Sequence, residues 1–283
     1  MPRIEEAIVA GEGGLPKVTI ATADGARAEI YLHGAHVTSW IPARGAERLF
    51  VSSRSEFTPG VAIRGGVPVI FPQFANEGPL PKHGFARTAQ WELLSLSSGE
   101  IANAVFRMSS SPATEAIWPH AFTAELAVSV GGRSLDLELS IVNTGATPFA
   151  FTAALHTYLR VADCRQTVVR GLEGLTYRDS TAGGVRRRDT AERVAIADEV
   201  NRIYFDVPSP LTVEEPNRAT TIDMDGFTDV VVWNPGPASA HTLSDMEPDG
   251  YLRMLCVEAA AIEPPVRLEQ GGRWSGRQRL RAD

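Results

Sequence analysis

The sequence has very little cysteine, very little lysine and no long apolar segment. Cys164 and Cys256 are its only cysteines in 283 residues, too few for a disulfide framework. No CxxC pair or Cys/His cluster predicts a structural zinc site. No apolar run approaches the roughly 20 residues that span a bilayer, and the acidic start MPRIEEAIVAGEGG does not resemble a signal peptide. We therefore expect a cytoplasmic protein that has no membrane partner.

The charge balance is acidic, with a formal net charge of −7. Such a balance disfavours a nucleic-acid or anionic-membrane surface. Nearly all basic residues are arginine, and lysine occurs only at Lys17 and Lys82. A small anionic substrate stays possible, because a pocket needs only two or three local cations.

The common catalytic and nucleotide-binding motifs are missing as well. There is no Walker A sequence, no GxGxxG in a strand–turn–helix unit and no GxSxG nucleophile elbow. His33 and His36 are three residues apart, but no third metal ligand is near, so we expect surface or strand-end histidines.

What the chain does have is many short strand-like segments. The segment SLDLELSIVNTG at 134–145 alternates leucine and isoleucine with polar residues, which is typical of a half-buried strand. We expect a further strand over Leu211–Ile222 and helical character only around Asp245–Leu252. The arginine-rich segment Val185–Arg188 is expected to be a solvated loop. The pattern predicts one all-β domain of antiparallel strands covering residues 1–283.

The segment at 62–91 is the densest source of polar chemistry. It is rich in glycine and proline, which fix backbone turns rather than fill a core. It carries Arg64, Lys82, His83 and Arg87. A guanidinium is a planar fork that matches phosphate, and glycines beside both arginines would let backbone N–H groups approach the same anion. The alternative is a pair of surface or salt-bridging arginines.

Two further titratable residues lie in apolar sequence, His156 in AALHTYL and Glu258 in MLCVEAAAI. A buried acid is costly unless it is paired or hydrogen-bonded. Glu258 could bond buried backbone or an arginine, and His156 could be a core histidine. Together they could form an acid–base pair that moves protons at neutral pH, although spacing does not show that they meet.

The blocks AIRGGVPVIFPQF, KHGFAR, ALHTYL, DVVVWNP and MLCVEAAAI occur in the order typical of one family. Over about residue 30 to the C-terminus, the chain resembles the glucose-6-phosphate 1-epimerase family of the aldose 1-epimerase superfamily. The resemblance implies an antiparallel β-supersandwich of the galactose mutarotase type with an open cleft. It also implies interconversion of the α and β anomers of an aldohexose 6-phosphate without cofactor or metal.

The resemblance implies three catalytic residues. Glu258 would remove the proton from the C1 hydroxyl, and His156 would protonate the ring oxygen. His83 would hydrogen-bond the sugar near that oxygen.

The resemblance also implies a set of substrate-binding residues. These are Arg64 and Arg87 on the phosphate, Gln73 nearby, Asp229 as a hydroxyl acceptor or an orienting residue, Trp233 as an aromatic wall, and Asn201. Relatives carry an acidic residue in an EVDR-like segment where this chain has Asn201, which accepts a hydrogen bond but has no charge.

Two other functions are compatible with the same residues. An aldose 1-epimerase for unphosphorylated sugars would use Arg64 and Arg87 only structurally. A non-catalytic sugar-phosphate-binding protein could share the fold, since fold does not fix function. In each case the superfamily leads us to expect a monomer.

Overall fold

The computed structural model describes residues 4–283, and strands make up nearly half of this range. Its helices are short. The α-helices are α1 (Ile4–Ala7), α2 (Pro112–Glu115) and α3 (Gly236–Ala240), and the 3₁₀ turns are η1 (Glu12–Gly14), η2 (Ala86–Thr88), η3 (Cys164–Gln166), η4 (Ser180–Ala182) and η5 (Gly250–Arg253).

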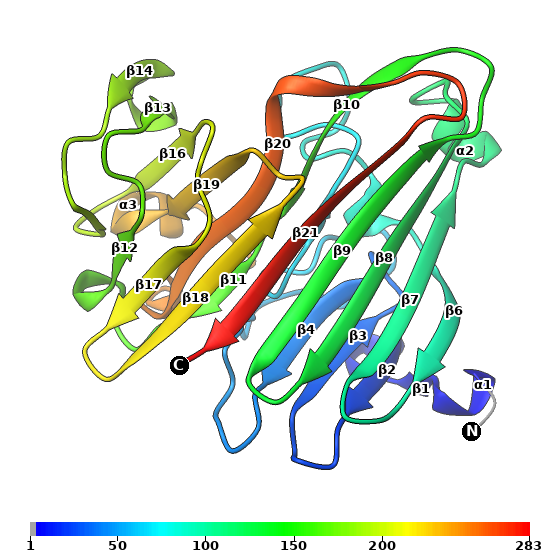
Figure 1. Ribbon diagram of the computed structural model, residues 1–283, viewed down its shortest axis with the longest axis horizontal. Coiled ribbons are helices and arrows are strands. Elements are labelled where there is room, and N and C mark those ends of the chain that lie inside the picture. Colours follow the sequence, from blue (N-terminus) through cyan, green and yellow to red (C-terminus); the bar gives the residue numbers. More distant parts are fainter. Residues whose placement is uncertain (1–3) are drawn as a thin grey trace.

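The strands form three sheets in which the paired neighbours run antiparallel (Figure 1). The four-stranded sheet holds β1 (Val9–Ala10), β2 (Pro16–Ala21), β3 (Arg27–Tyr31) and β4 (His36–Ile41). The eight-stranded sheet runs β14 (Val185–Arg188), β13 (Thr176–Asp179), β16 (Val200–Tyr204), β19 (Asp229–Asn234), β20 (Met254–Leu268), β10 (Phe149–Leu155) and β5 (Val69–Ile70), with β11 (Tyr158–Arg160) also paired to β20. The nine-stranded sheet runs β15 (Arg193–Ala195), β12 (Val168–Arg170), β17 (Leu211–Glu215), β18 (Arg218–Asp225), β21 (Arg273–Ala282), β9 (Ser134–Asn143), β8 (Phe122–Gly131), β7 (Ala102–Ser109) and β6 (Glu92–Ser97).

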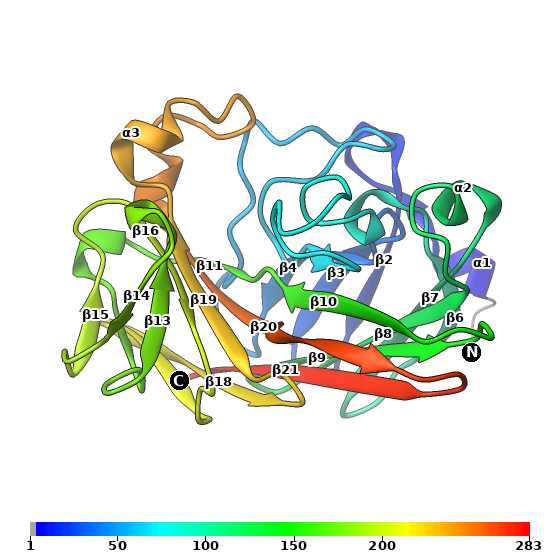
Figure 2. The same ribbon diagram turned by 90° about the horizontal axis from the view of Figure 1, so that it is seen from above.

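The two large sheets lie face to face, as Figure 2 shows for β8, β9 and β21 in one layer and β10, β20 and β19 in the next. The side chains of Leu135, Leu137 and Leu139 on β9 are fully buried and belong to the main core. Val257 and Ala259 of β20 belong to the same core. The half-buried strand predicted from the alternation is therefore confirmed, since every second residue of β9 packs between the sheets. The all-β antiparallel fold is confirmed.

The first nine residues of strand β20 are buried on both faces of the strand. Its residues from Met254 to Ile262 are all buried. Val257 and Ala259 face the main core, whereas Cys256, Glu258 and Ala260 alternate with them and face the other side. This arrangement explains the continuous apolar run in the sequence, and it places Glu258 on the face away from the main core.

Three local expectations were wrong. The segment 211–222 belongs to two strands, β17 and β18, because Pro216 and Asn217 make a two-residue turn between the paired residues Glu215 and Arg218. The range 245–252 forms no α-helix, only a turn that leads into η5. The arginine-rich segment forms the exposed strand β14, which pairs with β13.

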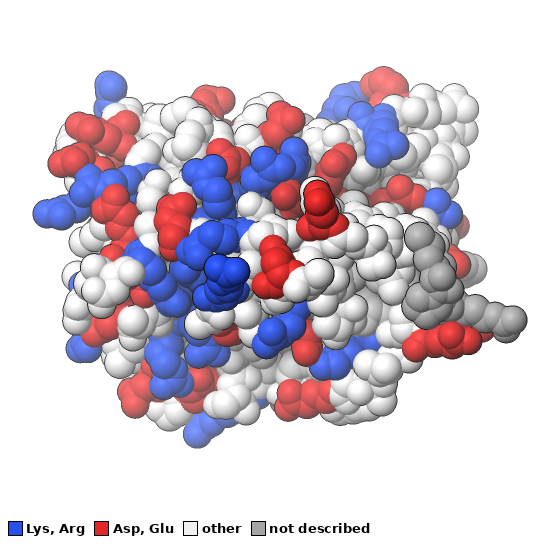
Figure 3. Space-filling view, turned by 60° about the horizontal axis from the view of Figure 1, so that its bottom comes forward, with Lys and Arg blue, Asp and Glu red and all other residues white. Residues whose placement is uncertain are grey.

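Charged side chains of both signs cover the molecular surface. On the face in Figure 3, Lys and Arg side chains form a broken band that Asp and Glu side chains border. On the outer face of the nine-stranded sheet, Arg277 and Arg279 of β21 both pair with Asp136 of β9. Within residues 4–283, none of the helices has the length and apolarity that a membrane crossing requires.

The register of β9 generates a stability prediction. Leu137→Ala should lower the free energy of unfolding by about 2–5 kcal/mol, because a fully buried side chain would leave a cavity between the sheets. The neighbouring Glu138→Ala is the matched control, since Glu138 is exposed and the change should stay within about 0.5 kcal/mol. Urea unfolding measures both variants, and equal losses would contradict the assigned faces.

Candidate active site

A cleft of about 400 Å³ lies over the face of the eight-stranded sheet that is turned away from the main core. Its floor comes from three neighbouring strands. Asn201 lies opposite Trp233, and Val231 lies opposite both Ile203 and Glu258. Because side chains alternate along each strand, these five residues share one face. The remaining wall comes from the segment at 74–87, which crosses this face as a loop.

Glu258 and His156 meet on this floor. The Nε2 atom of His156 lies 3.4 Å from Oε1 of Glu258, and their side chains are 9% and 1% exposed. His156 occupies the break between β10 and β11, where its backbone N–H donates to the carbonyl of Pro68. Its ring stacks on Tyr158 at a centroid distance of 4.8 Å. The structure thus places His156 and Glu258 in contact, which the spacing in the sequence did not show.

Burial shifts both of these groups toward their uncharged forms. It raises the pKa of Glu258 well above the ordinary value for a carboxyl, although the Arg87 charge acts in the opposite direction. Burial lowers the pKa of His156 well below its usual range, and the nearby His83, Arg87 and Arg64 lower it further. Within residues 4–283, Oε2 of Glu258 and Nδ1 of His156 have no hydrogen-bond partner. Two such groups in contact share one proton and can exchange it.

His83 lines the same cleft in a fixed protonation state. Its backbone has a φ of 69°, and its Nδ1 accepts a hydrogen bond of 3.2 Å from the N–H of Ala75. Burial, followed by the charges of Arg87, Lys82 and Arg64, lowers the pKa of His83 to about 3. The ring is therefore neutral at pH 7 with its proton on Nε2. Its centroid is 5.5 Å from that of His156.

Arg64 reaches the cleft from a tight glycine turn. Gly65 and Gly66 have φ values of 119° and 61°. A Cβ on Gly66 would lie 2.2 Å from the carbonyl oxygen of Val37, so only glycine fits. Nε2 of His36 donates to the carbonyl of Gly65 at 2.7 Å and braces the turn. His36 is the first residue of β4, which agrees with the strand-end alternative, and it is fully buried rather than at the surface.

Three cations lie in the cleft: Arg64, Lys82 and Arg87. Arg64 binds the carboxylate of Asp245 at 3.0 Å and donates from Nη1 to the Tyr158 hydroxyl at 3.0 Å. Arg87 donates only to the backbone carbonyl of Lys82, and its buried Nε has no partner within residues 4–283. Burial, then the charges of Arg64 and Arg87, lowers the pKa of Lys82. The cations thus repel one another, which favours binding of an anion between them.

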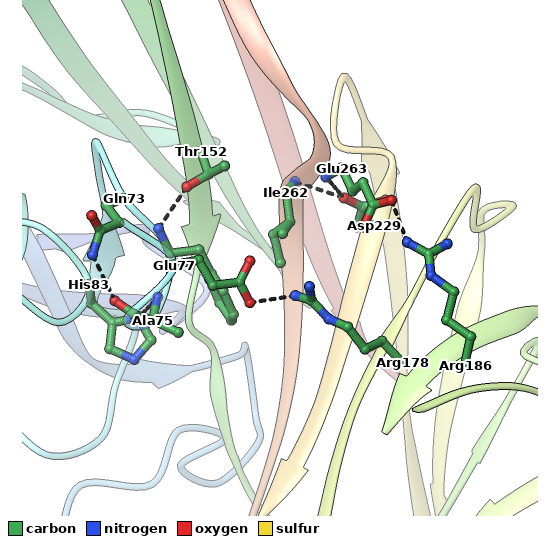
Figure 4. Close-up of polar contacts among 11 residues, drawn as sticks. Gln73, Ala75, Glu77, His83, Thr152, Arg178, Arg186, Asp229, Ile262 and Glu263 are labelled. Atoms are coloured by element: carbon green, nitrogen blue, oxygen red, sulfur yellow. Dashed lines mark hydrogen bonds and ion pairs between the residues drawn. The ribbon is translucent and has the colours of Figure 1, made fainter. Parts of the chain in front are cut away.

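Gln73 and Asp229, both expected among the substrate-binding residues, do not line the cleft. The buried amide of Gln73 bonds the backbone of Ala75 and Leu80 instead. Oδ2 of Asp229 accepts the N–H groups of Ile262 and Glu263 at 2.7 and 2.9 Å (Figure 4). The alternation along a strand shows on which face of the sheet a side chain lies, but it does not show whether that side chain forms hydrogen bonds with backbone groups or faces the cleft.

Sequence reasoning assigned no role to some cleft residues. Tyr158 supports the cleft without lining it: it stacks on His156 and accepts a hydrogen bond from Arg64, and its position two residues after His156 was the available signal. Asn76 and Ser180 line the cleft but lie in loop and 3₁₀ segments without any periodic pattern. In the described part of the chain, no group of three or more His, Cys, Asp or Glu side chains is arranged to hold a metal ion.

Comparison with known proteins places this geometry in context. The family model for aldose 1-epimerase matches residues 16–281. A Cenchrus ciliaris protein named "Putative glucose-6-phosphate 1-epimerase" is 37% identical over 97% of this chain and 87% of its own. An Escherichia coli K12 protein of the same name is 37% identical over 83% of this chain and 79% of its own.

Solved structures match over the whole fold. The crystal structure of a mutarotase from Salmonella typhimurium, described there as putative, has a TM-score of 0.91 and 29% identity, covering 100% of this chain and 95% of that one. A galactose mutarotase-like protein from Lactobacillus casei has a TM-score of 0.77 at 15% identity, covering 94% of this chain and 100% of that one, and shares the fold.

The buried histidines generate a pH prediction. His36 and His83 have folded-state pKa values of about 3, against an ordinary 6.5. Between these values the unfolded chain binds more protons than the folded one, so stability should fall as pH falls from about 6.5 toward 3. His36→Gln keeps a donor for Gly65 and removes one such group. The slope between pH 4 and 6 should decrease by up to about 1.4 kcal/mol per pH unit.

The control for this measurement is His241→Gln, which changes an exposed imidazole. Denaturant unfolding at several pH values gives each slope. If His36→Gln keeps the wild-type slope, His36 is not buried in its neutral form.

Proposed function

The chain belongs to the aldose 1-epimerase family, and from that premise we propose that it interconverts the α and β anomers of glucose 6-phosphate or a related aldohexose 6-phosphate. The enzyme class follows from the family. The observation that carries the choice of substrate is the presence of the His156–Glu258 pair and three cations in one cleft. The names of the relatives from Cenchrus ciliaris and Escherichia coli support the same substrate.

We assign the phosphate to Arg64, Lys82 and Arg87. The mutual repulsion of these cations favours a dianion between them. Arginine suits this task because its planar fork matches phosphate oxygens. The side chains of Asn201 and Trp233 lie side by side on the floor and would contact the sugar, Asn201 at one of the sugar hydroxyls and Trp233 through its ring face. Asp229 and Gln73 support the site from outside it.

The reaction needs one base and one acid. The Glu258 carboxylate takes the proton from the C1 hydroxyl, the C1–O5 bond breaks, and its electron pair goes to O5. His156 gives O5 a proton, which yields the open-chain aldehyde. Rotation about C1–C2 and closure in the reverse sense produce the other anomer and return both protons. His83 donates from Nε2 to the oxygen that gains charge.

Phosphate binding would also prepare the acid. In the free protein, the charges of Arg87 and Arg64 lower the pKa of His156. A phosphate dianion on these arginines offsets their charge, so it raises the pKa of His156 and favours its protonated form. This coupling gives a physical reason for a phosphorylated substrate to react faster than a free sugar.

An unphosphorylated aldose is the second candidate substrate, and one observation favours it. Arg64 already has a carboxylate partner in Asp245 and a bond to Tyr158, as a structural arginine would. Under this reading the cations brace the cleft wall, and the substrate needs no phosphate.

We further propose that the protein is a cytoplasmic monomer. A sugar phosphate carries charge that does not cross an apolar layer unaided, so its enzyme belongs where the substrate is made. Light scattering tests the oligomeric state, and a dimer mass would overturn the proposal.

Saturation-transfer NMR of anomer exchange separates the substrates. Exchange in glucose 6-phosphate should accelerate on addition of protein, whereas glucose in a parallel sample should respond much less. Arg87→Ala should reduce the rate with the phosphorylated sugar by about tenfold to a hundredfold, since a charge-assisted contact is lost. Equal acceleration of both sugars would favour the unphosphorylated substrate, and none with either would leave a binding protein.

Glu258→Gln tests the base. The amide is nearly isosteric but accepts no proton, so kcat should fall by about 10²–10⁴. The affinity for glucose 6-phosphate, measured by calorimetry, should change little because the cations are untouched. Activity within threefold of wild type would remove Glu258 from the reaction.

A further inference from the structure

We propose that Gln73 is a positioning residue, which fixes His83 as a neutral imidazole that carries its proton on Nε2. The expected kinetic effect rests on the proposed function, whereas the protonation site of His83 does not. Gln73 is 5% exposed and does not line the cleft. It acts through the loop between Ala75 and His83.

The amide of Gln73 holds this loop from inside. Its Nε2 donates to the carbonyls of Ala75 at 3.2 Å and Leu80 at 3.0 Å, and its Oε1 accepts the N–H of Leu80 at 2.9 Å. The loop packs so closely on the amide that a Cβ on Gly78 would lie 2.4 Å from Oε1. Both N–H groups and the oxygen of the Gln73 amide therefore form hydrogen bonds with the backbone of the loop, and these bonds hold the loop in place.

Ala75 transmits this brace to His83. The N–H of Ala75 donates to Nδ1 of His83 at 3.2 Å, and the backbone N–H of His83 donates to the carbonyl of Ala75 at 2.9 Å. That carbonyl is the one that Gln73 binds. A backbone N–H can only donate, so Nδ1 must present a lone pair and the proton of the neutral ring lies on Nε2.

The loop is also anchored at its root and near its tip (Figure 4). At the root, the N–H of Phe74 donates to Oγ1 of Thr152 on β10 at 2.6 Å. Near the tip, Glu77 forms an ion pair with Arg178 of β13. That pair is partly exposed, and such pairs contribute little to stability. The buried amide of Gln73 is thus the contact that sets the position of Ala75.

The protonation site decides what His83 offers to the sugar. With the proton on Nε2, the ring donates a hydrogen bond into the cleft and can stabilise an oxygen that gains negative charge. With the proton on Nδ1, the same position would hold a lone pair and repel that oxygen. The Ala75 contact selects the donor form.

The spectroscopic test is the nitrogen-15 spectrum of the imidazole rings in the full-length protein without substrate, with His83→Gln used to assign the signals. Wild type should show His83 only as the Nε2–H form. Gln73→Glu keeps the shape but cannot donate to the carbonyls of Ala75 and Leu80, so a second form with the proton on Nδ1 should appear. Gln73→Ala repeats the test if the carboxylate variant does not fold.

Asn143→Ala is the matched control. The buried amide of Asn143 donates to the carbonyls of Thr147 and Leu268 and accepts the N–H of Gly145, in a turn away from the cleft. It should lose similar stability without any change in the His83 signals. A single Nε2–H form in the Gln73 variants, or the same new form in Asn143→Ala, would overturn the proposal.

Kinetics with glucose 6-phosphate give a second measurement. Gln73→Glu should lower kcat by about tenfold to a hundredfold and change KM less, because Lys82 is the only one of the three proposed phosphate-binding cations in the braced loop, whereas Arg64 and Arg87 lie outside it. Arg178→Ala should change kcat less than threefold. A larger loss in Arg178→Ala than in Gln73→Glu would assign the positioning to the tip contact and contradict the proposal. If wild type shows no anomer exchange, the proposed function fails while the spectra still test Gln73.

Discussion

The burial of one carboxyl group is the constraint on which the rest of the site depends. Glu258 is 1% exposed at the middle of a strand that is covered on both faces. An ionised carboxylate in such a place is costly, so its surroundings must either compensate it or keep it protonated. Its neighbours do both, since His156 is within proton-transfer distance and Arg87 acts on it from the cleft wall. A base with a raised pKa next to a histidine with a lowered one is suited to moving protons near neutral pH.

The cleft wall depends on backbone geometry more than on apolar packing. Gly65, Gly66, His83 and Gly84 all have positive φ, and a Cβ at any of the three glycines would lie 2.2 Å from a backbone carbonyl oxygen. These turns direct Arg64, His83 and Arg87 toward the floor from one stretch of chain. The rigid sheet beneath supplies the acid–base pair, and the turns supply the donors and cations. Catalytic groups are commonly distributed in this way, on loops that a stable sheet positions.

Much of this could be read from the sequence because it depends on local patterns. The alternation in 134–145 predicted β9, and the apolar neighbours of His156 and Glu258 predicted their burial. The prediction of one strand over Leu211–Ile222 was wrong because its β-branched residues favour a strand, whereas Pro216 and Asn217 form a turn that divides it into β17 and β18. Gln73 and Asp229 were placed by resemblance near the substrate, yet both turn toward backbone groups. No local pattern reveals that choice, because it depends on which backbone N–H and C=O groups other segments leave unpaired.

The sequence alone therefore determined the class of fold, the buried and exposed faces of β9, and the burial of His156 and Glu258. These follow from side-chain periodicity and transfer free energies, which act over a few residues. Only the tertiary structure decided that His156 and Glu258, 102 positions apart, lie 3.4 Å from each other. Only the tertiary structure gave Arg64 a partner in Asp245 and gave His83 a fixed proton. These contacts arise from the pairing of distant strands, and strand pairing is a property of the whole chain.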